Sequence, residues 1–388
     1  IETSLGELIE SIPKVYQEVD GVIIDVKAEY VLNGTTVNFK LSNFRTDVPL
    51  VIDPWVTYLG GSGADQSFGL DVDNNGNAIV VGQTASTVFP SSVGAFQAVY
   101  GGNNDAFISK LNANGNLLFT TYYGGNQNDV ANGVIVNNSG DIFIAGTTLS
   151  TGLSTAGSLQ PVKGTGSDIF IAKFNSAGVR QWATYYGGIT NDLGISIETD
   201  SNGDIIVTGQ TGGSLPGTAS GFQPTYGGGT IDACVIKINA AGTSSSWATY
   251  YGSTGAEISS EVDIDRSNNI IVIGRSSSNN LSTTAGCAQS IYGGGANDAF
   301  AIKLNTSGAR IWSTYHGGSF DEYGMGIAAD ANDDVIISGL SSSTNLPVST
   351  GCYQSNYVGG GDGCGYICKL DKNTGAIIWS TYYGTSVW

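Results

Sequence analysis

Short stretches of alternating apolar and polar residues recur along the chain, and Gly, Asn or Asp bounds each of them. This pattern is typical of half-buried β-strands joined by tight turns. From about residue 62 four such stretches follow one another in a fixed order and end in an aromatic phrase, such as WATYYGG at 182–188. Copies of the phrase begin at intervals of 64, 63, 65, 65 and 67 residues, at Trp55, Phe119, Trp182, Trp247, Trp312 and Trp379. A fixed period of this kind predicts a repeat architecture.

Each period predicts four antiparallel strands, for example over 193–200, 204–211, 232–238 and from Trp247 onward. Tight turns join the first strand to the second and the third to the fourth, whereas a connection of about 20 residues joins the second to the third. Four antiparallel strands in tandem units predict an all-β fold, a β-propeller of four-stranded antiparallel blades. A parallel β-helix is the main alternative, and it fits hairpin turns of this kind poorly. Five complete blades are visible, near 62–125, 126–188, 189–252, 253–317 and 318–385.

The first 54 residues form a separate β-rich segment, before a propeller predicted over 55–388. Strands are predicted over 22–32, 36–44 and 49–59, with a hairpin turn at Asn33-Gly34. A short helix or turn is expected over 6–17. The segment is either the tail of an upstream domain or part of a sixth blade, in which 55–61 would be the outer strand.

The repeated phrase predicts packing between blades. Because side chains alternate along a strand, Trp182, Thr184 and Tyr186 should face one neighbouring blade, and Ala183 and Tyr185 the other. The Gly pair that follows releases the chain into the next blade and can accept positive φ angles. A lysine recurs in the third strand of each predicted blade. We expect its aliphatic stem to pack against the blade and its ammonium group to reach water or an Asp. These lysines are Lys110, Lys173, Lys237, Lys303 and Lys369.

Composition and charge exclude several function classes. The net charge of −18 reflects few basic residues, and no cluster of Lys and Arg suggests a nucleic-acid partner. No apolar stretch is long enough for a transmembrane segment. The chain starts at Ile1 without Met or a signal peptide, so we expect a processed or truncated piece.

Five cysteines leave two alternatives. Cys287 and Cys352 are aligned with the positions of Phe96, Leu159 and Phe222 in other repeats, which favours buried thiols in a packing slot. The alternative is a disulfide from Cys352 to Cys364 or Cys368 within the last repeat. No zinc motif accompanies the cysteines, and His316 is the only histidine.

The phrase W-x-T-Y-x-G-G, followed by D-x-x-G-N/D-x-x-V-x-G-x-T and D-A-F-x-x-K-L-x-x-x-G, resembles a bacterial repeat named for a seven-bladed β-propeller. The segment from Ile12 to Gly63 resembles the end of the domain that commonly precedes those repeats. The resemblance covers nearly the whole chain and implies a large secreted or surface-attached protein of Bacteroidetes-like bacteria. It implies no catalytic residues. The chain departs from the family in its five or six blades and in Cys364, which replaces a recurrent Asp.

The long connections all fall on one face of the predicted propeller, so a binding surface is expected there. An acidic residue precedes each innermost strand on that face: Asp65, Asp129, Asp192, Glu257 and Glu322. Together these residues predict a ring of carboxylates around the mouth of the central channel, a candidate site for Ca²⁺ or another hard cation, since such cations take oxygen ligands. The alternative is that each acid caps its own turn by accepting backbone N–H groups. The turn acids Asp73, Asp200, Asp265 and Asp330, with Asn137, and the third-strand acids Asp105, Asp168, Asp232 and Asp298 are assigned to turns in the same way.

The sequence therefore favours a non-catalytic, secreted or cell-surface propeller that serves as a structural or interaction module. It needs no cofactor, Ca²⁺ aside, and binds a protein or glycan partner on the long-loop face. The first alternative is a carbohydrate-binding propeller of the lectin type. A glycan-active hydrolase is the second, because Glu261, Asp321 and His316 break the repeat symmetry and such enzymes work with paired carboxylates.

Overall fold

The computed structural model describes residues 2–3, 6–7, 14–19, 21–33, 36–53, 57–90, 94–359 and 363–384. The chain divides into two compact units. One consists of Ile1–Tyr58 with Asn114–Asn116, and the other of Leu59–Ala113 with Leu117–Trp388. No helix among these residues is long and apolar enough to cross a membrane.

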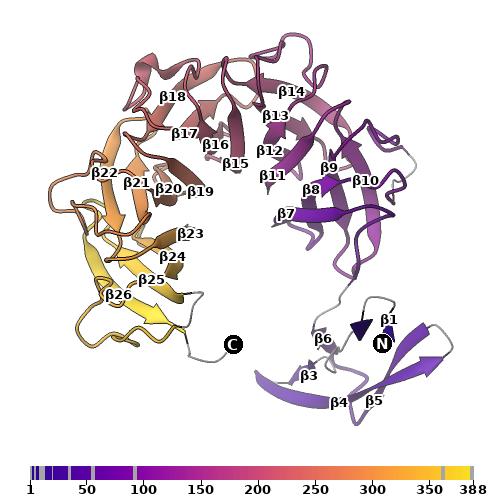
Figure 1. Ribbon diagram of the computed structural model, residues 1–388. Coiled ribbons are helices and arrows are strands. Elements are labelled where there is room, and N and C mark those ends of the chain that lie inside the picture. The colour runs from indigo at the N-terminus through magenta and orange to yellow at the C-terminus, as the bar shows by residue number, and fades with distance from the viewer. Residues whose placement is uncertain are drawn as a thin grey trace. The chain divides into compact units, whose positions relative to one another are not determined.

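The larger unit consists of five antiparallel sheets, each with its four strands in chain order (Figure 1). Blade 1 contains β7 (Asp65–Val72), β8 (Ala78–Thr84), β9 (Asp105–Leu111) and β10 (Leu117–Tyr123). Blade 2 contains β11 (Asp129–Val136), β12 (Ile142–Thr148), β13 (Asp168–Phe174) and β14 (Arg180–Tyr186). Blade 3 contains β15 (Asp192–Thr199), β16 (Ile205–Thr211), β17 (Asp232–Ile238) and β18 (Ser245–Tyr251), with a 3-10 turn, η1 (Thr218–Ser220). Blade 4 contains β19 (Glu257–Ile264), β20 (Ile270–Ser276), β21 (Asp298–Leu304) and β22 (Arg310–His316). Blade 5 contains β23 (Glu322–Ala329), β24 (Val335–Ser341), β25 (Cys364–Leu370) and β26 (Ile377–Tyr383).

The smaller unit has a different strand order. Its four-stranded sheet runs β5-β4-β3-β6, so β6 pairs with β3 instead of extending the meander. Its strands are β3 (Lys14–Val19), β4 (Val22–Asn33), β5 (Thr36–Ser42) and β6 (Val51–Asp53), beside a pair formed by β1 (Glu2–Thr3) and β2 (Gly6–Glu7). These described strands therefore do not repeat the order of a blade.

Two predictions for this segment change. The helix expected over 6–17 is wrong where the structure describes it, because Gly6–Glu7 and Lys14–Val19 are strands. The strand expected over 49–59 is observed only as Val51–Asp53, since residues 57–59 are irregular and 54–56, with Trp55, lie outside the described residues. At the predicted hairpin Asn33 pairs with Thr36, while Gly34 also lies outside them.

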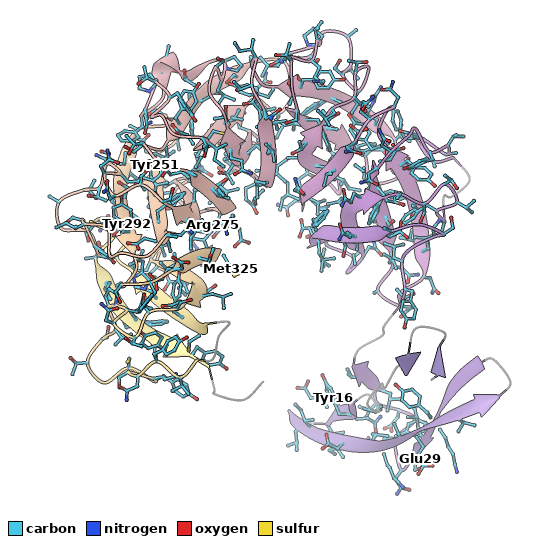
Figure 2. The ribbon with its side chains drawn as sticks, viewed as in Figure 1. Tyr16, Glu29, Tyr251, Arg275, Tyr292 and Met325 are labelled. Carbon is cyan, nitrogen blue, oxygen red and sulfur yellow. The ribbon has the colours of Figure 1, made fainter. Side chains whose placement is uncertain are left out.

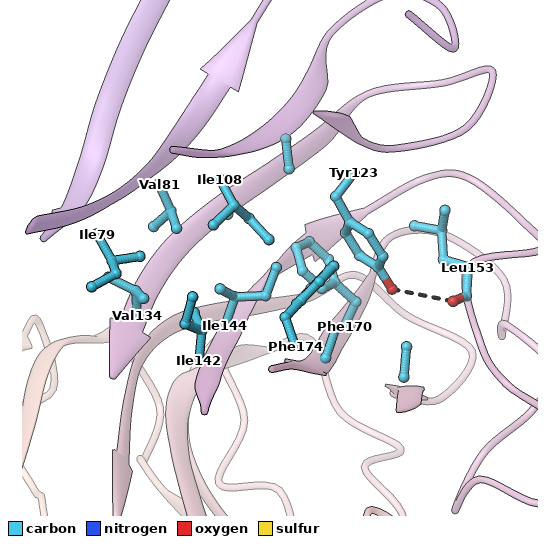
Figure 3. Close-up of a cluster of buried hydrophobic side chains, with 14 of the residues drawn as sticks. Ile79, Val81, Ile108, Tyr123, Val134, Ile142, Ile144, Leu153, Phe170 and Phe174 are labelled. Carbon is cyan, nitrogen blue, oxygen red and sulfur yellow. Dashed lines mark hydrogen bonds between the residues drawn. The ribbon is translucent and has the colours of Figure 1, made fainter. Parts of the chain in front are cut away.

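Blades 2, 3 and 4 are sheets whose two faces are both buried against neighbouring blades. The alternation predicted for the fourth strand is confirmed: Trp182 and Tyr186 pack into the cluster shared with blade 3, whereas Ala183 and Tyr185 pack into the cluster shared with blade 1. Four such clusters lie at the four junctions between consecutive blades. Figure 3 shows the first, in which Val134 of β11 packs with Ile79 and Ile108 of blade 1.

The aromatic residue that opens the phrase rests on a glycine of the next blade. A Cβ atom on Gly308 would lie 2.7 Å from the ring of Trp247, and one on Gly375 would lie 2.7 Å from the ring of Trp312. Both glycines have positive φ in the tight turn between the third and fourth strands. The indole N–H of Trp247 also donates to the Thr306 carbonyl at 3.0 Å. Glycine is therefore required there both for the turn and for the close approach of the ring.

Candidate functional site

The predicted carboxylate ring lies where expected, at the first residue of each innermost strand, β7, β11, β15, β19 and β23. Four of the five acids are fully buried. One carboxylate oxygen of each accepts a backbone N–H four residues upstream, as from Gly125 to Asp129 at 2.7 Å and from Gly318 to Glu322 at 2.7 Å. Asp65, Asp192 and Glu257 accept the equivalent bond at 2.8 Å. The alternative assignment, that each acid caps its own turn, is confirmed.

In most blades the second carboxylate oxygen accepts a hydroxyl group at the end of the second strand. Ser276 donates to Glu257 at 2.6 Å, Ser341 donates to Glu322 at 2.6 Å, and Thr148 donates to Asp129. Both oxygens of these acids are thus bound within their own blade. Among the described residues no group of three His, Cys, Asp or Glu side chains could hold a metal ion. The geometry gives the predicted Ca²⁺ ring no support.

A second buried acid faces four of the five ring acids, all except Asp65, across a blade junction. These are the third-strand residues Asp105, Asp168, Asp232 and Asp298, and each accepts a loop N–H, as from Gly293 to Asp298 at 2.6 Å. One oxygen of each has no hydrogen-bond partner in the described structure. Burial, together with the neighbouring Glu257 or Glu322, raises the pKa of Asp232 and of Asp298 to about 7. Each of these four junctions therefore holds two carboxyl groups, and at the junctions that follow blades 3 and 4 the third-strand Asp is readily protonated near neutral pH.

The first glycine of the repeated phrase lies between these two acids. A Cβ atom on Gly252 would lie 2.4 Å from one oxygen of Asp232 and 2.7 Å from one of Glu257. Gly124, Gly187 and Gly317 meet the equivalent carboxyl groups. The described phrase glycines do not use the positive φ angles that glycine can accept, because none of them has a positive φ. They are glycines because the carboxyl pair leaves no room for a side chain.

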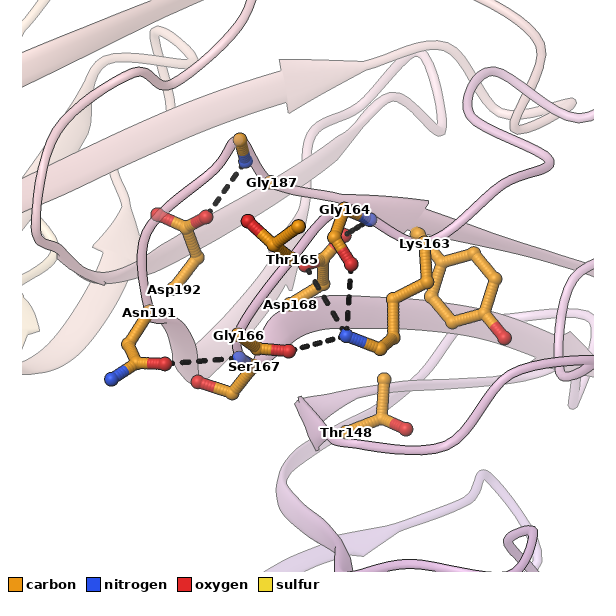
Figure 4. Close-up of polar contacts among 12 residues, drawn as sticks. Thr148, Lys163, Gly164, Thr165, Gly166, Ser167, Asp168, Gly187, Asn191 and Asp192 are labelled. Atoms are coloured by element: carbon orange, nitrogen blue, oxygen red, sulfur yellow. Dashed lines mark hydrogen bonds and ion pairs between the residues drawn. The ribbon is translucent and has the colours of Figure 1, made fainter.

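The junction between blades 2 and 3 differs from the others because it contains a lysine. The ammonium group of Lys163 lies 3.9 Å from the otherwise unpartnered oxygen of Asp168 (Figure 4). It also donates to the carbonyls of Gly164 and Gly166. Tyr226 and Tyr292 stand at the equivalent position in blades 3 and 4, where each hydroxyl donates to a loop carbonyl at 3.2 Å.

The innermost strands of blades 1 to 5 line a cleft of about 470 Å³ that contains acids of a different kind. Asp71, Glu198 and Glu261 line the cleft, and Asp263, two residues after Glu261, occupies the same position in β19 as Asp71 in β7 and Glu198 in β15. Burial and the charges of Asp263, Asp71 and Glu261 raise the pKa of Glu198 to about 8. The sequence signal was a break in the repeat, since Ile135 and Ala328 stand at this position in blades 2 and 5. Sequence reasoning had noted only Glu261.

Most of these acids also connect the innermost strands of neighbouring blades. Asp71 accepts the N–H of Val136 at 2.6 Å, Glu261 that of Ile327 at 2.7 Å, and Asp263 that of Ala329 at 2.6 Å. Neutral side chains do the same elsewhere, as when Asn132 donates to the Gly194 carbonyl at 2.7 Å. The acids therefore have a structural role that needs no ligand.

Two other residues that break the symmetry are also committed to packing or capping. His316 replaces a tyrosine and is fully buried against Tyr366 at 5.1 Å between ring centroids, and burial lowers its pKa to about 4. Asp321 accepts the N–H groups of Ala296 and Asn297. No carboxylate pair in the described residues thus combines free oxygens with an open surface of the long-loop face.

The structure changes both predictions made for the cysteines, the disulfide and the alignment of Cys287 and Cys352 with the packing slot. All five thiols are free, so the disulfide predicted from Cys352 is absent. The packing slot lies one residue later than predicted, because its residue directly precedes the Gln that recurs in the long loops. Ala288 and Tyr353 thus align with Phe96, Leu159 and Phe222, but only Ala288 is half-buried, because Tyr353 is 83% exposed. Cys287 and Cys352 are half-buried and donate their N–H to the Thr284 and Ser349 carbonyls of their own loop turns.

The recurrent Gln clamps each long loop. The amide N–H₂ of Gln289 donates to the Ile291 carbonyl at 2.8 Å, and its oxygen accepts the N–H of Gly317 at 2.8 Å. Gln97 and Gln160 make the same bonds to Val99 and Val162. The clamp fixes the backbone two residues after the Gln and leaves its side chain in solvent: Val99, Val162 and Ile291 are 76%, 76% and 74% exposed. Thr225 and Asn356 stand at the same position in blades 3 and 5, and we name these five residues the loop ridge.

The fold and these contacts define an all-β chain built of β-propeller blades. A family model described as Beta-propeller repeat matches residues 55–90, and a model described as Domain of unknown function (DUF7948) matches residues 1–55. An uncharacterized WD repeat-containing protein of Acanthamoeba polyphaga mimivirus is 25% identical over 425 residues, which cover 87% of this chain and 30% of that protein. Regulatory protein FlaEY of Caulobacter vibrioides is 25% identical over 287 residues, covering 67% of this chain and 28% of that protein.

The chain thus spans less than a third of the length of either relative. Among solved structures, a protein of unknown function from Dyadobacter fermentans is 13% identical with a TM-score of 0.41, covering 87% of this chain and 90% of that one. A second protein of unknown function, from Bacteroides caccae, is 9% identical with a TM-score of 0.41, covering 84% of this chain and 85% of that one.

Proposed function

We propose that this chain is a non-catalytic interaction module of a secreted or cell-surface protein and that it binds a protein partner through the loop ridge. The observation that carries the proposal is the pairing of exposure with rigidity at Val99, Val162 and Ile291. Each is a large aliphatic side chain held in solvent by a backbone that the preceding Gln fixes. Pre-ordered apolar side chains lose little conformational entropy on binding, which favours a protein interface.

The charged groups support a binding role over a catalytic one. The ring acids and third-strand acids are buried and hydrogen-bonded within the blades, so they are not placed to act on a substrate. Location outside the cell rests on the resemblance of the repeats alone.

The lectin alternative depends on exposed aromatic side chains at equivalent loop positions. The recurrent loop tyrosines pack inward instead: Tyr226 and Tyr292 lie edge-on against Tyr250 and Tyr315, at 5.9 Å and 5.7 Å between ring centroids. A stacking platform for a sugar needs a free aromatic face, which this arrangement does not offer at these positions.

A displayed library of random peptides provides the test, with the intact chain as bait. Peptides enriched by the chain should bind a V99S/V162S/I291S variant roughly tenfold or more weakly, a loss of about 1.4 kcal/mol. The matched control is L118S/V179S/I378S, which changes three aliphatic residues of 49%, 50% and 46% exposure outside the loop ridge. Equal binding of the enriched peptides to both triple variants would contradict the proposal. Binding to a glycan array that the ridge variant retains would favour the lectin alternative.

A further inference from the structure

Every internal junction joins the same two blade faces. The forward face of a blade presents two aliphatic positions of its second and third strands and two aromatic positions of its fourth strand. In blade 1 these are Ile79, Ile108, Phe119 and Tyr123, and they pack against Val134 and the following strands of blade 2 (Figure 3). Equivalent sets form the clusters between blades 2 and 3, 3 and 4, and 4 and 5.

The forward face of blade 5 is exposed in the described structure. Tyr383 is 60% exposed, whereas the equivalent Tyr123, Tyr186, Tyr251 and His316 are at most 1% exposed. Trp379 is 38% exposed, although Trp247 and Trp312 are nearly or fully buried. We name the surface formed by Ile336, Ile367, Trp379 and Tyr383 the tail face.

The rear face of blade 1 is exposed in the same way. Leu70 is 65% exposed, whereas the equivalent residues Val134, Ile197, Val262 and Ile327 are between 3% and 8% exposed. Val72 is also exposed, and Val80 is only half-buried although its equivalents in blades 2 to 5 are buried. We name the surface formed by Leu70, Val72 and Val80 the head face.

We propose that the tail face of one copy of this chain binds the head face of a second copy. The fit is demonstrated four times within the chain, because each internal junction joins a forward face to a rear face of the same repeat. Leu70 of one copy would pack against the surface formed by Ile336 and Ile367 of the other, as Val134 packs in one cluster with Ile79 and Ile108. Exposed apolar surface of this kind is typical of interaction sites.

Polar contacts at the internal junctions extend the match. The hydroxyl of Tyr123 donates to the Leu153 carbonyl at 3.1 Å, and that of Tyr186 donates to the Pro216 carbonyl at 2.7 Å, both in the long loop of the next blade. The corresponding loop of blade 1 contains Phe89 and Pro90, so Tyr383 of the partner copy should donate to one of their carbonyls. The tail and head are different surfaces, so the association is head-to-tail and each copy retains one free face.

Sedimentation velocity over a dilution series tests the proposal with the intact chain. The wild-type chain should shift to larger species as its concentration rises. L70E places a charge on the head face and W379E places one on the tail face, and each variant alone should remain monomeric. An equimolar mixture should form a one-to-one dimer and nothing larger, because L70E retains its tail face and W379E retains its head face.

V179E is the matched control, since Val179 is 50% exposed and lies on neither face, and it should associate like the wild type. Circular dichroism and thermal melts establish that each variant folds, and the exposed positions make unfolding unexpected. A wild-type chain that stays monomeric at every concentration would overturn the proposal. Association that persists in both single variants, or a mixture of them that forms no dimer, would do the same.

Discussion

The repeated Lys and Asp residues form five ion pairs across the tight-turn end of the blades. Lys303 meets Asp265 at 2.8 Å and Lys237 meets Asp200 at 2.7 Å, in agreement with the sequence prediction. In blade 2, where Asn137 replaces the usual acid, Lys173 pairs with Asp141 at 2.8 Å instead. The lysine position is thus constant although its partner changes.

Truncation of the buried lysine in the variant K303A should destabilise the chain strongly. It leaves the carboxylate of Asp265 buried without its cation, which costs about 3–5 kcal/mol. Chemical denaturation measures the loss. K369A is the matched control, because the side chains of Lys369 and Asp330 are 17% and 21% exposed and water can solvate the acid that remains. Equal losses in both variants would show that burial does not set the energy of these pairs.

The carboxyl pairs at the junctions make stability depend on pH. The pKa of Asp232 and of Asp298 is about 7 in the folded chain, well above the ordinary value of 3.8. The folded state therefore binds more protons than the unfolded state between those two values, so the stability these groups contribute falls as pH rises from about 4 to about 7. The Lys-paired acid Asp265 has a lowered pKa and loses its contribution only at lower pH.

The melting temperature should accordingly increase when pH is lowered from 8 to 5, and D298N should weaken that dependence. Asn carries no charge, so the substituted junction no longer releases a proton near neutral pH. We expect a change of a few degrees, given roughly 2–4 °C per kcal/mol for a domain of this size class. Differential scanning calorimetry at several pH values provides the measurement. A D298N variant with the wild-type pH profile would exclude this junction as the source.

At the scale of a strand, the aromatic phrase is the main determinant of blade packing. Sequence reasoning predicted its alternation correctly, because strand periodicity follows from backbone geometry alone. The glycine that each ring contacts could not be predicted in the same way. It is Gly308 or Gly375, about 60 residues later in the chain, and local patterns do not reveal which distant turn a side chain contacts.

W312A should cost about 3–5 kcal/mol, because the indole is fully buried between two blades and its removal leaves a cavity. W379A removes the same side chain from the same strand position of blade 5, where it is exposed, and should cost much less. Urea denaturation at low protein concentration compares the two variants. A large cost for W379A under those conditions would show that the tail face is covered within a single chain.

The long loops show a similar limit of prediction. The recurrent Gln was visible in the sequence, yet its role needed the structure because its side chain joins two separate backbone segments, at Ile291 and at Gly317. Q289A should release the loop tip at Ile291 while it leaves the blade intact. Amide hydrogen exchange should rise in residues 289–293 and remain unchanged in β21. Uniform exchange across the blade would mean that the Gln supports the fold rather than the loop.

At the scale of the whole molecule, the blade count and the acid sites depended on contacts that the sequence does not encode locally. The positions of the ring acids were predicted correctly. The structure was needed to show that their carboxylate oxygens accept a backbone N–H group and a hydroxyl group of their own blade. Sequence reasoning missed the acids of the innermost strands, Asp71, Glu198 and Asp263, because they lie in three different blades. Only alignment of the repeats by position brings them together.

The net charge of −18 opposes association of two copies, since like charges repel over the length at which salt screens them. Added sodium chloride should therefore strengthen head-to-tail association, and the apparent melting temperature should rise with protein concentration. Sedimentation and thermal melts at low and high salt measure both effects. Association that weakens with salt would indicate a contact dominated by opposite charges rather than by Leu70, Trp379 and Tyr383.

The junction between blades has a consequence for how such a chain can evolve. Each junction uses only residues of two consecutive repeats, and the same glycine, aromatic and carboxyl positions return at every one. Apart from Lys163, His316 and the acids of the cleft, the junction positions hold the same kinds of residue in every internal blade. A gene could therefore gain or lose a repeat of 63 to 67 residues by unequal recombination and keep the same type of interface. The exceptional residues, above all the acids of the cleft, would then meet different neighbours.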